Sequence, residues 1–270
     1  MSLLIAVQLY SVRDEANQDL RSTLESIKNM GYDGIELAGL CGQRPEDIRA
    51  MCEEIGLTPI SAHVSYSDMV ADIEILNKYV TIGCNYVAVP YLEDKDRPNT
   101  PEFANVIKNI KTIGRRAKAL GMVLLYHNHH FEFVKLDGRY ALDVLYDGVD
   151  KDLLQTEIDT CWVKVAGEDP AEYVRKYAGR CPVVHLKDMN DGVHDGVYEL
   201  SGTDTPTGEN VKAFEFRPVG SGIQDIPELL RAAEESGASW VVVEQDAPSM
   251  GLTPMESIKR SRENLKKLGY

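Results

Sequence analysis

The sequence reads VLLYHNHHFEF over Val123–Phe133. Its first three residues are apolar, which is typical of a buried parallel strand. Three of the six histidines of the chain follow within four positions, and Glu132 lies close behind them. Imidazole nitrogens and carboxylate oxygens are ligands that Zn, Mn, Fe and Co sites use. Taken alone, the stretch fits a metal site and a polar strand end equally well, so its neighbours must decide.

The rest of the chain alternates apolar strands with amphipathic helices. The predicted strands cover 4–9, 34–37, 58–63, 86–89, 123–125, 154–158, 183–186 and 240–243. The predicted helices cover 19–30, 45–55, 68–81, 101–120, 141–146, 170–177, 226–236 and 253–268. Eight such units indicate parallel strands with right-handed crossovers and have the size of a (β/α)₈ barrel. An open doubly wound sheet more often carries a glycine-rich loop after its first strand, and QLYSVRDE has no glycine. We predict a single TIM-barrel domain over residues 1–270.

One segment exceeds the minimal repeat, because residues 187–224 separate the seventh strand from its helix. The segment is rich in Asp, Gly and Thr. Loops of this length in a compact domain are often functional. It follows the carboxyl end of a strand, where barrel active sites are built. We expect a lid or an oligomer contact here, with a tolerated insertion as the alternative.

Composition excludes several classes of function. The net charge of −14, from 29 basic and 43 acidic residues, argues against nucleic acid as a partner, although one local cation could still hold the phosphate of a sugar. Five scattered cysteines without a CxxC pair indicate neither a disulfide framework nor a cysteine zinc site, and they favour a reducing compartment. No apolar run approaches the ~18 residues of a membrane span. The N-terminus reads as a strand rather than a signal peptide. We therefore expect a cytoplasmic protein that binds neither nucleic acid nor membrane.

Polar residues recur where the last four predicted strands end, and in a barrel these ends converge on one pocket. The candidates are His127, His129 and Glu132 on strand five, Asp159 on strand six, His185 on strand seven and Glu244 on strand eight. Glu132 and Asp159 are 27 positions apart, and Asp159 and His185 are 26 apart, which is one repeat each. Clustered buried carboxylates need a counter-charge, and a divalent cation supplies it. We predict one metal ion held by Glu132, Asp159, His185 and Glu244.

Other residues face the same predicted mouth and are candidates for binding substrate. Glu36 ends the second strand, His63 ends the third, and His127 stands at the fifth. Lys187 and Arg217 are candidates for holding an oxyanion. Each has an ordinary structural alternative: Glu36 could pair with a lysine, His63 could bond a loop carbonyl, and both cations could be solvated loop charges.

The chain resembles the xylose isomerase-like barrels, specifically the sugar phosphate isomerase/epimerase group with its ketose 3-epimerases and its inosose dehydratases and isomerases. The motifs that carry the resemblance are QLYSVRDE, GYDGIEL, YHNHHFEF, EIDTCWV, VVHLKD and FRPVGSGIQDI. They span the whole chain. The resemblance implies Asp159, His185 and Glu244 as metal ligands. The epimerases place a glutamate directly after the fifth apolar run, where this chain has Leu125 or Tyr126. Glu132 or His129 must then fill that role, and we expect Glu132.

The resemblance also implies a reaction. One divalent ion (Mn, Mg, Co, Zn or Fe) polarises a sugar carbonyl and acidifies the neighbouring carbon. Glu244 then removes the proton, and Glu132 or His129 returns one from the other face. This predicts an isomerase or epimerase acting on a sugar or sugar phosphate. Relatives imply a homodimer or homotetramer.

Three other functions can be set beside this one. A dehydratase or lyase on an inosose or a 3-keto-glycoside would use the same chemistry, with a histidine protonating the departing oxygen. A non-catalytic sugar-binding protein is a more distant alternative. An abasic-site endonuclease with three zinc ions would need more histidines and a basic face, so composition argues against it.

Overall fold

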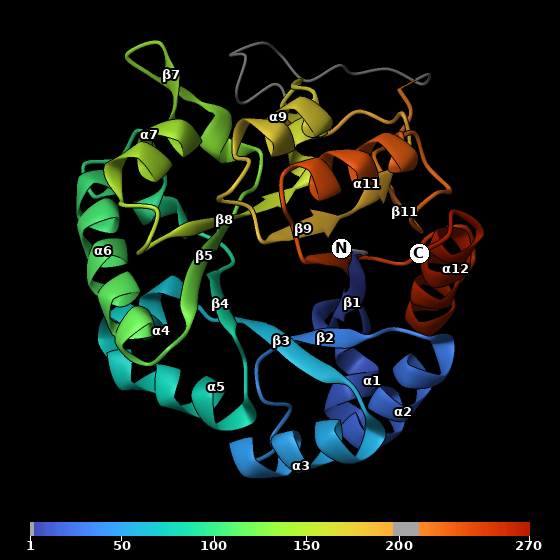
Figure 1. The fold of residues 1–270 in the computed structure, drawn as a ribbon. Helices are drawn as coiled ribbons and strands as arrows, with labels where there is room; N and C mark the ends of the chain where they lie inside the picture. The colour runs from blue at the N-terminus through green and yellow to red at the C-terminus, as the bar shows by residue number, and fades with distance from the viewer. Residues whose placement is uncertain (1–2, 197–210) are drawn as a thin grey trace.

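The computed structural model describes residues 3–196 and 211–270. Eight parallel strands close into a barrel in the order β1-β12-β9-β8-β5-β4-β3-β2 (Figure 1). These strands are β1 (Leu4–Gln8), β2 (Gly34–Ala38), β3 (Thr58–His63), β4 (Tyr86–Val89), β5 (Val123–His127), β8 (Gln155–Asp159), β9 (Val183–Leu186) and β12 (Trp240–Val243). The closed parallel barrel confirms the fold class predicted from the alternation of strands and helices.

Helices surround the barrel on the outside (Figure 1). They are α1 (Arg13–Gln18), α2 (Leu20–Met30), α3 (Pro45–Ile55), α4 (Tyr66–Ala71), α5 (Leu76–Ile82), α6 (Phe103–Ala119), α7 (Ala141–Gly148), α8 (Thr160–Val165), α9 (Pro170–Lys176), α11 (Ile226–Glu235) and α12 (Pro254–Lys267). Short 3₁₀ turns are η1 (Leu9–Val12), η2 (Ile73–Ile75), η3 (Asp94–Asp96) and η4 (Phe131–Phe133). One small hairpin pairs β6 (Lys135–Leu136) with β7 (Arg139–Tyr140).

The pleat of the strands separates two apolar cores. Side chains from alternate positions form a small cluster inside the barrel: Ala6, Ile60, Ala88, Leu125, Val183, Trp240 and Val242. The intervening positions, such as Ile5 and Val7, belong to the large core that packs the strands against the helices. Side chains two positions apart on a strand point to the same side. Residues two positions beyond the inner cluster therefore point into the barrel at its carboxyl end, and among them are His127, His185 and Glu244.

Helix boundaries follow the predicted capping rules where proline and glycine mark them. Helix α3 begins with Pro45 and ends at Gly56, whose φ of 78° is left-handed, as the sequence predicts. The prediction of one continuous helix over 68–81 is wrong, because the helix is interrupted at its middle. Asp72 adopts an extended conformation there, and its side chain accepts a hydrogen bond from the Glu74 N–H, which separates α4 from η2 and α5.

The connection from β9 to α11 contains a two-stranded antiparallel ribbon. It pairs β10 (Asp188–Met189) with β11 (Phe216–Arg217). The predicted insertion over 187–224 includes this ribbon, and residues 197–210 of it lie outside the described residues. The expected lid or oligomer contact stays a prediction.

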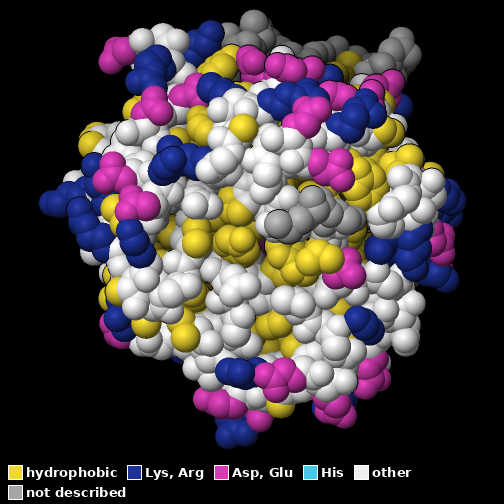
Figure 2. Space-filling view, in the orientation of Figure 1, with side chains coloured by type: hydrophobic (Ala, Val, Ile, Leu, Met, Phe, Trp, Pro, Cys, Tyr) yellow, Lys and Arg dark blue, Asp and Glu magenta, His cyan; other side chains and the backbone are white. Residues whose placement is uncertain are grey.

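The face shown in Figure 2 has hydrophobic side chains gathered toward its middle and charged ones mainly around its edge. Within residues 3–196 and 211–270, no helix combines the length and the apolar character needed to cross a bilayer.

Candidate functional site

Four side chains from neighbouring strands converge inside the carboxyl end of the barrel. His127 ends β5, Asp159 ends β8, His185 lies in β9 and Glu244 follows β12. All four are buried, and one ligand atom from each lies within 4.8 Å of the others. The structure thus brings together Asp159, His185 and Glu244, three of the four predicted ligands. The fourth member of the group is His127, which the sequence suggested as a substrate-binding residue.

Each member of this group is held by a further contact. His185 Nδ1 lies 3.0 Å from Glu244 Oε2. His127 Nε2 lies 3.3 Å from Asp159 Oδ2, and its Nδ1 lies 3.2 Å from the carbonyl oxygen of Pro90. The second oxygen of Asp159 caps helix α8. The contacts of His127 with Pro90 and of Asp159 with α8 are of the kind that fixes the orientation of metal ligands.

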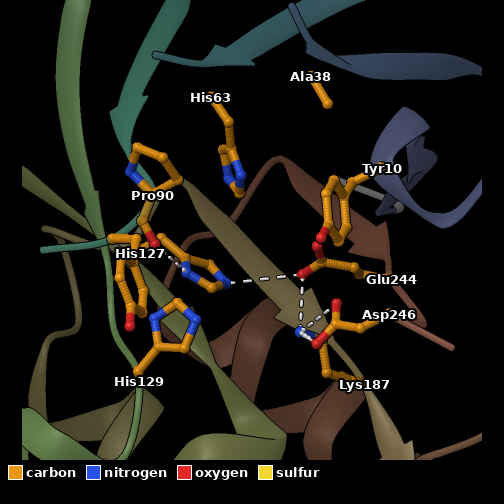
Figure 3. A pocket seen from close by; sticks show the side chains of 10 residues that line it. Tyr10, Ala38, His63, Pro90, His127, His129, Lys187, Glu244 and Asp246 are labelled. Carbon is orange, nitrogen blue, oxygen red and sulfur yellow. Dashed lines mark hydrogen bonds and ion pairs between the residues drawn. The ribbon is translucent and has the colours of Figure 1, made fainter. Parts of the chain in front are cut away.

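Lys187 lies beside the group and is also buried. Its Nζ is 3.0 Å from Glu244 Oε2 and 3.1 Å from Asp246 Oδ1 (Figure 3). It is also 3.4 Å from Asp159 Oδ2. One ammonium thus faces three carboxylates. Lys187 alone does not balance these carboxylates, and a divalent cation would supply further positive charge beside them.

The electrostatics give Glu244, Asp159 and His127 the protonation states that a metal site requires, whereas His185 would have to release a proton when a metal binds. Burial opposes ionisation of Glu244, yet Lys187 and His185 lower the pKa of its carboxyl well below the ordinary value. Lys187 and His127 likewise lower the pKa of Asp159 against the effect of burial. Burial lowers the pKa of His127 to about 4. Two carboxylates and two imidazoles form a donor set that fits Zn, Mn, Fe or Co.

A second buried group lies next to the first and shares His185 with it. Its other members are Glu36, His63 and Glu157. His185 Nε2 is 2.7 Å from Glu36 Oε2, and His63 Nε2 is 3.0 Å from Glu157 Oε2. The Oε1 atoms of both glutamates have no hydrogen-bond partner in the described part of the chain. Although burial opposes it, Glu157 and Glu36 raise the pKa of His185 well above its ordinary value.

Glu157 was not among the predicted site residues. Its signal was present in the sequence, because it precedes Asp159 by two positions and so shares its side of the strand. Asp246 was missed in the same way, since it follows Glu244 by two positions.

A cavity of about 490 Å³ opens onto the first group. It is lined by Tyr10, Ala38, His63, Pro90, Tyr91, His127, His129, Lys187, Glu244 and Asp246. His129 lies on one side of this pocket, and Lys187, Glu244 and Asp246 lie on another (Figure 3). Proton-transferring groups therefore border the pocket from more than one side.

His129, a predicted catalytic residue, belongs to an aromatic wall. Its ring centroid lies 5.0 Å from that of Tyr91, 5.3 Å from that of Trp162 and 5.6 Å from that of Phe131. Burial lowers the pKa of His129 well below its ordinary value, so the ring is neutral. Its Nδ1 has no hydrogen-bond partner among the described residues.

Glu132 does not join the group with which the sequence associated it. Its Oε1 accepts a hydrogen bond from the Tyr126 hydroxyl at 2.6 Å, and its Oε2 accepts one from the His129 N–H at 2.9 Å. Tyr126 packs in the core between strands and helices, whereas His127 points the other way into the barrel. Burial raises the pKa of Glu132 to about 7. Its carboxyl therefore stabilises the turn after β5 by hydrogen bonds on the outer side of that strand.

The remaining predicted substrate-binding residues are distributed as follows. His63 and Lys187 line the pocket, and Glu36 lies buried beneath it in the second group. Arg217 is not among the residues that line the pocket, and its Nη2 pairs with Glu215 Oε2 at 2.6 Å.

Comparison with known proteins gives one family match and a set of distant relatives. Residues 24–268 match the model of the xylose isomerase-like TIM barrel family. An inosose dehydratase of Geobacillus kaustophilus is 24% identical over 94% of this chain and 88% of the relative. An inosose dehydratase of Lacticaseibacillus casei is 26% identical over 64% of this chain, and that alignment spans only 57% of the relative.

Solved structures share the fold at lower identity. A sugar phosphate isomerase/epimerase from Parabacteroides distasonis superposes with a TM-score of 0.77 at 22% identity, over 98% of both chains. The IolI protein, crystallised with a bound zinc atom, superposes with a TM-score of 0.73 at 16% identity, also over 98% of both chains.

Proposed function

The chain belongs to the xylose isomerase-like TIM barrel family, and from this premise we propose that it is a divalent-metal-dependent enzyme acting on a sugar or sugar derivative. The reaction that we propose is an isomerisation or epimerisation through removal of a proton beside a carbonyl. The observation that carries the proposal is the convergence of four buried donors beside a pocket bordered by further acid and base groups. The zinc atom of the IolI protein supports the metal requirement.

We assign the metal ligands to His127, Asp159, His185 and Glu244. His127 replaces Glu132 in the set predicted from the sequence, because the carboxyl of Glu132 is bound to Tyr126 and His129 instead. When bound there, a divalent ion supplies Lewis acidity that polarises a carbonyl and acidifies the adjacent carbon.

The residues around the pocket divide the proton transfers between two sides. Glu244 takes the proton from the carbon beside the carbonyl. On the other side the neutral ring of His129 relays a proton from solvent to that carbon, taking one up at one nitrogen as it releases one from the other. Lys187 keeps its positive charge, because Asp246, Glu244 and Asp159 raise its pKa well above the ordinary value against the effect of burial. Its ammonium stabilises negative charge that develops on the substrate oxygen.

A dehydratase or lyase is the second candidate, and the names of the curated relatives favour it. Removal of the same proton can be followed by loss of a hydroxyl from the next carbon. His129 would then donate a hydrogen bond to the departing oxygen, and the proton that Glu244 removed would end on the water that leaves. An inosose or a 3-keto-glycoside is the corresponding substrate.

The test combines metal analysis with hydrogen exchange. Purified protein is analysed for bound metal and then incubated in D₂O with a panel of ketoses, inososes and 3-keto-glycosides. Deuterium at the carbon beside the carbonyl is the expected result, with a new epimer or isomer. Exchange accompanied by loss of water or an aglycone would favour the lyase. Sugar binding without exchange, undiminished after metal removal, would point to a non-catalytic binding protein.

The variant Glu244→Gln isolates the predicted base. We expect it to lose both metal retention and exchange, at least 100-fold in rate, because Glu244 serves in both. Glu53→Gln is the matched control, since Glu53 is exposed on α3 and pairs only with Arg49 in the described structure. Full exchange by Glu244→Gln would remove Glu244 from the mechanism.

A further inference from the structure

The hydrogen-bond ladders between the barrel strands end at the level of the proposed metal ligands. The ladder between β5 and β8 extends to the pair of His127 and Glu157. The ladder between β8 and β9 extends to the pair of Asp159 and His185. Asp159 therefore lies two positions beyond the last residue of β8 that pairs with β5. Other groups must bond its backbone on that side, because buried backbone N–H and C=O groups are rarely left unpaired.

The side chain of Asn128 bonds both backbone groups of Asp159. Its Oδ1 accepts a hydrogen bond from the Asp159 N–H at 3.0 Å, and its Nδ2 donates to the Asp159 carbonyl oxygen at 3.4 Å. One amide thus supplies the acceptor and the donor that a further strand residue would otherwise supply. Asn128 directly follows His127 in the chain. It therefore ties the end of β5 to the end of β8, where His127 Nε2 lies 3.3 Å from Asp159 Oδ2.

Thr160 makes the corresponding link between β8 and β9. Its Oγ1 donates a hydrogen bond to the His185 carbonyl oxygen at 3.0 Å. Its own carbonyl oxygen accepts one from Gln224 Nε2 at 2.9 Å, which ties the segment before α11 to the same place. Thr160 directly follows Asp159, just as Asn128 follows His127. In both cases the residue after one proposed ligand holds the backbone of the next.

Neither of these two side chains is placed to touch substrate. Asn128 and Thr160 are fully buried, and neither is among the residues that line the pocket. Both are uncharged, and their polar atoms bond the backbone of the neighbouring strand end. Their contacts therefore act on where the ligand-bearing strands end.

We propose that Asn128 and Thr160 are positioning residues that set the spacing of the metal ligands, and with it the affinity and the geometry of metal binding. The inference rests on the proposed function, because it takes His127, Asp159 and His185 as ligands. Functional side chains must be held within about 0.5 Å of their working geometry by residues that support them from behind. The contacts with Pro90 and α8 fix the orientation of two ligands, whereas these links fix the positions of the strand ends.

The test measures metal binding to the full chain, with the metal alone as the probe. Asn128→Ala removes both bonds to Asp159, and Thr160→Val removes the bond to His185 while keeping the size of the side chain. Each variant is titrated with Zn²⁺ and Mn²⁺ against a chelator of known affinity. The visible absorption spectrum of the Co²⁺-loaded protein reports the geometry of the ligands. We expect Kd to rise about tenfold or more and the Co²⁺ spectrum to change in both variants.

Asn190→Ala is the matched control, because Asn190 is also a buried asparagine that bonds only backbone groups in the described structure. Its Nδ2 donates to the Ala213 carbonyl oxygen at 2.8 Å, and its Oδ1 accepts from the N–H groups of Gly192 and Glu215 at 2.9 and 3.0 Å. These partners all lie in the connection between β9 and α11. We expect the control to lose stability but to keep the wild-type Kd and Co²⁺ spectrum.

Wild-type Kd values and Co²⁺ spectra in both Asn128→Ala and Thr160→Val would overturn the inference, even if both proteins are less stable, and would leave the proposed function standing. An equal change in Asn190→Ala would also overturn it. If Asn128→Ala does not fold, the result for Thr160→Val decides, because valine has nearly the shape of threonine. A wild-type protein that binds none of the three metals would overturn the proposed function and the inference with it.

Discussion

The ring of His185 is shared between the two buried groups of the barrel. Its Nδ1 faces Glu244 at 3.0 Å, and its Nε2 faces Glu36 at 2.7 Å. A metal held on the Nδ1 side leaves Nε2 to donate its proton to Glu36. Carboxylates in this position fix the tautomer and orientation of a ligating imidazole. The role that the structure supports for Glu36 is therefore to position a ligand rather than to touch substrate.

Replacement of Glu36 by Gln should weaken metal binding. The amide keeps the size of the side chain but lacks the charge that holds the imidazole proton, so we expect a 10- to 100-fold increase in metal Kd. Competition with a chelator of known affinity measures it. Glu132→Gln is the matched control, because Glu132 is equally buried but contacts Tyr126 and His129 instead. Equal Kd values in the two variants would refute the positioning role.

We expect the ionisation of Glu132 to contribute to the pH dependence of the free energy of unfolding. Burial raises its pKa to about 7, above the ~4.3 of an unfolded chain. The folded state then binds more protons than the unfolded state, so stability falls as pH rises from about 4 to about 7 and levels off above that. The decline corresponds to roughly 4 kcal/mol for this group.

The measurement compares urea denaturation of the metal-free wild type and the Glu132→Gln variant at pH 5 and pH 8. We expect the variant to lose this part of the decline, since its amide does not titrate. Parallel profiles for the two proteins would show that Glu132 ionises normally.

At the scale of elements, the connection between β9 and α11 is organised by one buried carboxylate. Asp188 accepts four backbone hydrogen bonds, which tie the loop of Gly220–Gln224 to the end of the ribbon. Helix α4 illustrates the opposite effect of a similar residue. The side chain of Asp72 captures a backbone N–H and interrupts the helical pattern expected over 68–81.

Replacement of Asp188 by Ala should destabilise the protein strongly. It removes a fully buried carboxylate that accepts from four backbone N–H groups, and we expect a loss of about 3–5 kcal/mol in the free energy of unfolding. Urea denaturation followed by far-UV circular dichroism provides the value. Asp225→Ala removes an exposed cap from α11 and should cost only about 1 kcal/mol. A smaller effect for Asp188→Ala than for Asp225→Ala would contradict this account.

At the scale of the whole molecule, the proposed metal ligands come from four of the eight barrel strands. They come from β5, β8, β9 and β12, which are consecutive in the closed sheet. A metal that binds only the folded chain stabilises it by mass action. A metal bound by these four residues would therefore couple its site to the closure of the barrel.

Removal of the metal should lower the thermal midpoint. With free metal at about 100 times Kd, the stabilisation is about 2.7 kcal/mol, which corresponds to roughly 5–10 °C for a chain of this size. Differential scanning calorimetry with and without a chelator measures the shift. Glu244→Gln is expected to show little shift, and a shift as large as that of the wild type would remove Glu244 from the ligand set.

Much of this protein follows from the sequence because local rules govern it. The alternation of strands and helices predicts the barrel, and Pro45 and Gly56 mark α3 at both ends. Because side chains alternate along each strand, Asp159, His185 and Glu244 can each point into the barrel from the end of its own strand. The neighbouring strands then bring the three side chains together. These features depend on neighbours in the chain or on one repeated topology.

The sequence left Glu132 or His129 as the ligand from strand five, whereas the tertiary structure places His127 beside Asp159, His185 and Glu244. Glu132 and His127 lie in the same stretch, but the turn η4 carries Glu132 back toward Tyr126 on the outer side of β5, while His127 points inward. Only the tertiary structure shows that His185 contacts both Glu244 and Glu36. It alone also shows that Asp188 accepts four backbone hydrogen bonds. Such features depend on side chains from distant segments that compete for the same few donors. The spacing of residues in the sequence predicts which polar side chains reach the end of the barrel. Which hydrogen-bond partner each side chain has is determined by the folded chain.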